Sequence, residues 1–193
     1  MYEWQANAFL MKPGKVLDKQ LQPLTVGHAF LLESIKSPFY VGGNYETGDL
    51  VLAVWICSMT FADACKFLSQ PPADMEKQAK QWGKLASKTR CNVIFDAAQF
   101  TRYIAEYCKM PDAWIDPDPV KAMTKRESAY PLAMRVAWCL MAHGIPEKAA
   151  YDMPMNRALQ YYGIEGERNG QQFVTDEEDS VIDNLPESGA ANG

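Results

Sequence analysis

The apolar residues that follow Thr25 recur every three or four positions, which is the spacing of one face of an α-helix. Thr25 belongs to the residue types that favour the N-cap position. Pro38 disfavours the α conformation at Ser37, the residue before it. Gly42 and Gly43 then indicate a loop. The pattern therefore predicts a first helix between Thr25 and Ser37.

Two segments, residues 50–68 and 131–143, are apolar on nearly every side of the helix that each would form. A helix of this kind in a water-soluble protein must be surrounded by other helices. We therefore predict one helix that begins at Thr47 or Asp49 and runs to about Leu68, and a second from Pro131 to Ala142. Gly144 is expected to follow the second helix as its C′ residue. Both helices should lie at the centre of a bundle.

The remaining pattern predicts four further helices and a flexible end. A polar helix should begin at Asp74, another helix should run from Asn92 to Lys109, a short turn of helix should cover residues 146–151, and a last amphipathic helix should begin at Asp152. Strand-like alternation is confined to residues 172–175. We expect an all-α, single-domain bundle of about six or seven helices. Its parts are an N-terminal arm (1–24), a helical domain (25–168) and a polar, acidic, flexible tail (169–193).

The charges of the chain separate the body from the tail. All 19 Lys and Arg residues lie at or before Arg168, together with 18 of the 24 acidic residues, so the body has a net charge of +1. The other six acidic residues follow Arg168 and give the tail a charge of −6. The tail from Thr175 onward has too few apolar residues to offset the entropy lost on ordering. We expect it to be disordered.

The cysteines indicate a reducing compartment. There are five, an odd number, and no pair has C-x-x-C spacing. They are expected to be reduced, small core residues rather than a disulfide framework. No apolar run reaches the roughly 18 residues that span a bilayer, and the N-terminus lacks the features of a secretion signal. We expect a cytoplasmic protein.

The standard motifs of zinc proteases, phosphate loops, dinucleotide-binding folds and serine hydrolases are absent from the sequence. We therefore predict no catalytic site, no metal site and no cofactor. Asp116 and Asp118 could offer oxygens to a hard cation, but a stiff, solvated proline loop is favoured. His28 is expected to be a packed or surface histidine near a helix N-terminus, and His143 to interact with helix-terminal carbonyls.

Two charged residues interrupt the apolar helices, Asp63 and Arg135. Burial of either charge without a partner would cost several kcal/mol. The simplest solution is an ion pair between the two across the core, and we predict that pair.

Two features are candidates for binding a partner. Four lysines fall within one arc of the predicted polar helix and could follow phosphates, contact an acidic partner or contact the acidic tail of the chain itself, although a merely solvated face is the favoured interpretation. Methionines of the second half could line an adaptable apolar groove, with core packing as the default. The candidate partner-binding residues are Lys77, Lys80, Lys84, Lys88, Met153 and Met155.

Two segments, PLTVGHAFLLESIKSPF (residues 23–39) and DMPMNRALQYYGIEGERN (residues 152–169), resemble parts of small helical proteins encoded among the tail genes of tailed bacteriophages. Such proteins are often tail assembly chaperones. The resemblance implies a partner that is a long helical tape-measure protein or a tail-tube subunit, kept soluble during assembly. The segments contain no motif from which functional residues can be transferred.

These observations lead to three functional hypotheses. The first is a non-enzymatic assembly factor or chaperone that binds another protein through an apolar groove. The second is a nucleic-acid-associated protein that uses the lysines, although a body charge of +1 and an acidic tail disfavour it. The third is an enzyme whose site is assembled from scattered residues such as His28, Asp63 and Arg135.

Overall fold

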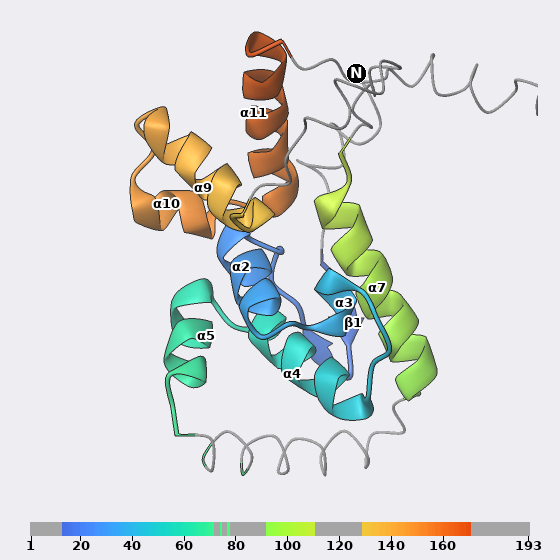
Figure 1. Cartoon of the computed structure of the whole chain (residues 1–193). Coiled ribbons are helices and arrows are strands. Elements are labelled where there is room, and N and C mark those ends of the chain that lie inside the picture. Colours follow the sequence, from blue (N-terminus) through green and yellow to red (C-terminus); the bar gives the residue numbers. More distant parts are fainter. Residues whose placement is uncertain (1–12, 72–73, 75–76, 78–91, 111–128, 171–193) are drawn as a thin grey trace, which may run out of the picture.

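The computed structural model describes residues 13–71, 74, 77, 92–110 and 129–170. This part of the chain is mostly helical, as predicted, and holds eight helices and one two-stranded antiparallel sheet (Figure 1). The elements are β1 (Lys15–Val16), β2 (Lys19–Gln20), α2 (Val26–Ser34), α3 (Pro38–Val41), α4 (Thr47–Ser58), α5 (Phe61–Leu68), α7 (Val93–Cys108), α9 (Leu132–Ala142), α10 (Glu147–Asp152) and α11 (Met155–Arg168).

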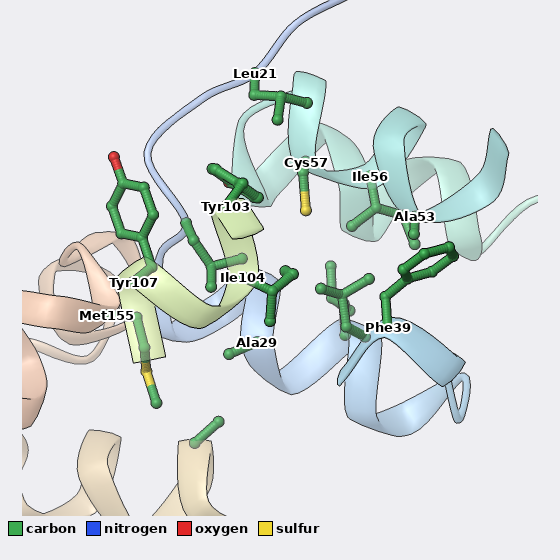
Figure 2. Close-up of a cluster of buried hydrophobic side chains, with 14 of the residues drawn as sticks. Leu21, Ala29, Phe39, Ala53, Ile56, Cys57, Tyr103, Ile104, Tyr107 and Met155 are labelled. Atoms are coloured by element: carbon green, nitrogen blue, oxygen red, sulfur yellow. The ribbon is translucent and has the colours of Figure 1, made fainter. Parts of the chain in front are cut away.

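Helix α2 lies at the centre of the described fold. It packs against α3, α4, α5, α9, α10 and α11 (Figure 1). Thr25 caps its N-terminus, because the Thr25 hydroxyl accepts a hydrogen bond from the backbone N–H of His28 at 3.2 Å. Leu32 and Ala29 are fully buried in the main apolar cluster, part of which Figure 2 shows. The first predicted helix is thus confirmed, and it forms the centre of the bundle.

The predicted single helix from about Thr47 to Leu68 is wrong, because the chain breaks it after Ser58. Met59 and Thr60 have extended backbone angles. The Thr60 hydroxyl accepts a hydrogen bond from the backbone N–H of Asp63 at 3.2 Å and so caps a new helix, α5. The apolar pattern continues across the boundary between α4 and α5, so only the cap residue, Thr60, marks that boundary in the sequence. Because of this break, α5 takes a different direction from α4 and packs on α2.

The described part of the N-terminal arm, residues 13–24, lies against the helices. Leu17 and Asp18 adopt positive φ angles in the tight turn between β1 and β2. Leu17, Leu21 and Leu24 are buried, and the backbone N–H of Leu17 donates to the Asp96 carboxylate on α7 at 3.1 Å. The sequence did not predict this hairpin, because its strands are too short to show alternation.

Helices α9, α10 and α11 follow one another at one end of the fold (Figure 1). Helix α9 ends as predicted, with Gly144 at a φ of +84° directly after the C-cap. Helix α11 begins after Pro154, so the predicted cap at Asp152 is wrong. Asp152 instead ends α10, where its carboxylate accepts a hydrogen bond from Lys148. Helix α11 also runs through Gly163 as far as Arg168.

Several predictions fall outside the described residues. They concern most of the polar helix after Asp74, the Asp116 and Asp118 loop, the strand-like residues 172–175 and the acidic tail. Among the helices that are described, none is both long and apolar enough to cross a membrane.

Candidate functional site: a groove between α9 and α11

Helix α9 carries a stripe of exposed apolar residues. Met134 and Trp138 are four residues apart and share one face of the helix, and Tyr130 precedes them by the same interval. Their exposed fractions are 37% for Met134, 70% for Trp138 and 66% for Tyr130. The prediction that other helices surround α9 on all sides is therefore wrong. Ala133, Val136 and the neighbouring small residues face the core instead.

This stripe forms one wall of an open groove, and helix α11 forms the other. The groove has a volume of about 840 Å³. The residues that line it are Tyr130, Met134, Arg135, Trp138, Cys139, Tyr162, Glu165, Gly166 and Asn169. On α11 the lining positions are three or four residues apart, so they too share one helix face.

Arg135 is the cation inside the groove. One of its terminal nitrogens, Nη1, lies 3.4 Å from the hydroxyl of Tyr162 and donates a long hydrogen bond to it. Its Nε is buried and has no hydrogen-bond partner among the described residues. A buried donor without an acceptor costs free energy, so Arg135 is prepared to receive a carboxylate or carbonyl oxygen. The groove thus combines aromatic surface with an available positive charge.

The predicted ion pair between Asp63 and Arg135 is wrong. Asp63 is exposed in the first turn of α5, where its carboxylate accepts a hydrogen bond from the Thr60 hydroxyl at 2.7 Å and lies 3.5 Å from the Lys66 ammonium. The Thr60 hydrogen bond, helped by Lys66, lowers the pKa of Asp63. Since a polar group at a helix N-terminus needs no distant partner, the sequence could not distinguish a cap from a core ion pair.

A polar cluster forms the rim of the groove on α11. The Glu165 carboxylate lies 3.2 Å from Nε2 of His143 and 3.4 Å from Nη1 of Arg168. The Asn169 side-chain amide donates to the same carboxylate at 3.3 Å. The predicted contact of His143 with helix-terminal carbonyls is made by its backbone N–H, which donates to the carbonyl oxygens of Cys139 and Leu140 at 3.3 and 3.2 Å, while its ring contacts Glu165. With Glu165 balanced in this way, Arg135 remains the unpaired charge of the groove among the described residues.

The groove does not have the features of a cysteine nucleophile. Cys139 lines it but is only 6% exposed. Burial, followed by the nearby negative charge of Glu165, raises the pKa of the Cys139 thiol. A reactive cysteine needs the opposite shift, because the thiolate is the nucleophile. Within the part of the chain that the structure describes, no three metal-ligating side chains come together either.

His28 is a packed structural residue, as predicted. It is 1% exposed. Its Nδ1 accepts a hydrogen bond from the backbone N–H of Thr25 at 3.3 Å, and its Nε2 lies 3.0 Å from the carbonyl oxygen of Met59. This arrangement requires the neutral tautomer with the proton on Nε2. Burial lowers the pKa of His28. The residue joins the cap of α2 to the break between α4 and α5.

The candidate methionines have different positions. Met155 is fully buried in the main cluster near Tyr107 (Figure 2), which agrees with core packing, the default interpretation, and leaves it unable to line a groove. Met153 is half-buried and lines a shallower hollow of about 530 Å³ with Lys148 and Arg157. Its backbone carbonyl accepts a hydrogen bond from the N–H of Val26 at 2.9 Å. The role of Met153 in partner binding stays a prediction.

Of the four candidate lysines, the structure describes Lys77, which is exposed. Lys80, Lys84 and Lys88 lie outside the described residues. The four therefore remain candidates, and Lys77, the described one, does not line the α9–α11 groove.

The sequence itself contains an indication of the groove. Tyr130, Met134 and Trp138 recur at intervals of four, and Arg135 adjoins them. A helix that is apolar all round is either enclosed or carries a binding surface, and a charged residue within it favours the second alternative.

Comparison of the chain with protein-family models, with curated proteins and with solved structures finds no match.

Proposed function

We propose that this protein is a non-enzymatic assembly factor or chaperone that binds a helical segment of another protein in the groove between α9 and α11. The observation that carries the proposal is Trp138, which exposes 70% of its surface on an apolar face of α9 beside the incompletely paired Arg135. An exposed tryptophan on an apolar face lowers the solubility of a protein, so a partner that covers Trp138 explains its position.

The composition of the groove supports a protein partner. Tryptophan, tyrosine and arginine are the residues that dominate the binding energy of protein interfaces. The groove contains Trp138, Tyr130, Tyr162 and Arg135. Two helices form its walls, and the face of a third helix fits between two such walls when its apolar residues recur every three or four positions.

The groove also indicates the chemistry of the partner. Its apolar anchors should pack on Trp138 and Met134, and one carboxylate should reach the guanidinium of Arg135. A tape-measure-like protein of a phage tail, long and helical, would supply many such segments, and so would a tail-tube subunit with an exposed amphipathic helix. We propose this class of partner, in keeping with the resemblance of residues 23–39 and 152–169 to tail-gene proteins.

Site-specific photo-cross-linking in the native cell or infection tests this proposal. Benzoylphenylalanine replaces Trp138 in one variant and Tyr161 in a matched control. Tyr161 is 48% exposed on α11 but does not line the groove. We expect one defined protein to be cross-linked from position 138 and not from position 161. The cross-linked peptide should be an amphipathic segment with an acidic residue.

Addition of Arg135→Gln to the position 138 variant should reduce the yield of cross-linked product. Equal yields from positions 138 and 161, or no product from position 138, would contradict the proposal. Binding through the groove should change little between low and moderate salt, whereas phosphate binding through the lysines should weaken steeply. Salt therefore separates this proposal from the nucleic-acid hypothesis.

A further inference from the structure

The chain leaves the described fold at the rim of the groove. Asn169 lines the groove, and Gly170 follows it with a φ of +86° that ends α11. Residues 171–193 come next. An extended chain covers roughly 3.3 Å per residue, so this segment can reach roughly 75 Å. Helix α9 is only about 16 Å long at 1.5 Å per residue. The segment is therefore long enough to cross the whole groove.

The chemistry of residues 171–193 complements the groove. The segment has six acidic residues and neither lysine nor arginine. Four of the acidic residues are consecutive, from Asp176 to Asp179, and apolar residues stand on both sides of them, with Phe173 before and Ile182 after. The groove offers the reverse, namely the cation Arg135 with an unsatisfied Nε between exposed aromatic side chains.

We propose that residues 171–193 occupy the α9–α11 groove of the same chain and compete with the partner for it. The acidic residues from Asp176 to Asp179 supply the carboxylate that Arg135 lacks, and the flanking apolar residues cover Trp138. Tethering raises the local concentration of such a segment to the millimolar range, so a weak contact suffices to hold it. The competition with a partner rests on the function proposed above, whereas the docking itself does not.

The groove suits this segment better than the lysines that the sequence pointed to. Lys77 is an exposed, solvated cation, and contacts between exposed charges contribute little. The groove combines one partly buried cation with apolar surface, so it can bind both the acidic and the apolar residues of the segment. The two locations predict different effects of substitutions, which makes them separable.

Nuclear magnetic resonance of the tryptophan indole N–H groups in the full chain tests the docking. The Trp138 resonance is identified by its loss in Trp138→Phe. Two tail variants are compared with the unaltered protein, one that neutralises the four acidic residues (Asp176→Asn, Glu177→Gln, Glu178→Gln, Asp179→Asn) and one that removes apolar anchors (Val181→Ser, Ile182→Ser). We expect both variants to shift the Trp138 resonance. The resonance of Trp55, which stacks on Phe67 away from the groove, is the internal control and should stay in place.

Two additions make the result decisive. A synthetic peptide of residues 171–193, added to the neutralised variant, should move the Trp138 resonance back toward its original position. In an Arg135→Gln background, neutralising the tail should produce a smaller shift. A Trp138 resonance that stays unchanged in both tail variants overturns the proposal. The proposal is also overturned if the tail variants shift the Trp138 resonance only in a protein in which all four lysines are changed (Lys77→Gln, Lys80→Gln, Lys84→Gln, Lys88→Gln). That result would mean that the tail normally contacts the lysines and reaches the groove only when they are removed.

The outcome is distinguishable from a failure of the proposed function. The resonance experiment contains no partner, and the cross-linking experiment reports only the partner. If the Trp138 resonance responds to the tail but position 138 gives no cross-linked product, the groove is an internal docking site and the proposed function fails. If the reverse holds, the groove binds a partner and the tail proposal fails. If both hold, the neutralised tail should raise the cross-linked yield several-fold.

Discussion

The ring of Phe61 lies directly against the α carbon of Gly27. A Cβ atom on Gly27 would lie 2.4 Å from Cδ2 of Phe61, far inside van der Waals contact. The same ring stacks on Tyr151 of α10, with ring centroids 5.4 Å apart. Helices α2, α5 and α10 therefore meet at a position where one of them must have no side chain.

This contact predicts a sharp difference between two glycine substitutions. Gly27→Ala should destabilise the protein by about 1–3 kcal/mol, because the core must shift to admit a methyl group. Gly163→Ala is the matched control in α11, since a Cβ there meets nothing within 4 Å. It should stabilise the protein by up to about 1 kcal/mol through helix propensity. Urea unfolding measures both, and equal effects would contradict the packing at Gly27.

His28 should make stability depend on pH below neutrality. Burial lowers its pKa from the ordinary value of 6.5, so the unfolded chain binds the proton more readily than the folded protein does. The contribution of His28 is therefore fully present above pH 6.5 and is lost as the pH falls toward the native pKa. Urea unfolding between pH 7.5 and pH 5 should show this loss. In His28→Gln the loss over this range should be smaller, and an equally steep loss would mean that His28 is not responsible.

Thr60 should matter as a helix cap, and Asp63 should not couple to Arg135. Thr60→Ala removes the side chain that caps α5 and should cost about 1 kcal/mol. The effects of Asp63→Ala and Arg135→Ala on the free energy of unfolding should add, because Asp63 contacts Thr60 and Lys66 instead. A double-mutant cycle measures this. If the double variant instead recovers stability lost in the single variants, the core ion pair between Asp63 and Arg135 that the sequence predicted would be supported.

The sequence predicted the helices whose boundaries carry specific residues. Thr25 capped α2 as expected, and Gly144 ended α9. The errors arose where apolar character continued across a boundary. Met59 and Thr60 interrupt the predicted long helix, although Trp55, Ile56 and Cys57 before them read as its interior. A single cap residue determines that break, and hydrophobic periodicity cannot show it.

The site was predicted less well than the fold. A groove near Met153 and Met155 was the alternative to core packing, and the full burial of Met155 agrees with core packing. Exposed and buried apolar residues have the same appearance in a sequence, because burial depends on which helices pack on which face. Trp138 read as core for that reason. Arg135 was recognised as anomalous, yet its position beside Trp138 on an open face required the packing of α9 on α11.

Trp138 and Trp55 should differ in their effect on stability. Trp138→Ala should change the free energy of unfolding by less than about 0.5 kcal/mol, because the side chain is mostly exposed. Trp55 is half-buried, stacks on Phe67 and lies under the Lys19 ammonium at 5.2 Å from the ring centroid. Trp55→Ala should cost about 1–3 kcal/mol or more. Thermal and urea unfolding compare the two, and a large loss in Trp138→Ala would mean that Trp138 supports the fold rather than a partner.

The affinity of the cross-linked partner segment for purified variants tests the groove most directly. The peptide identified from position 138 is synthesised and titrated calorimetrically into the unaltered protein, Trp138→Ala, Arg135→Gln and Tyr161→Ala. We expect Trp138→Ala and Arg135→Gln to bind the peptide about 10–100-fold more weakly than the unaltered protein, as hot-spot substitutions do. The affinity of Tyr161→Ala should stay within about twofold of the unaltered protein. Unaltered affinity in Trp138→Ala and Arg135→Gln, with both variants folded, would contradict binding in the α9–α11 groove.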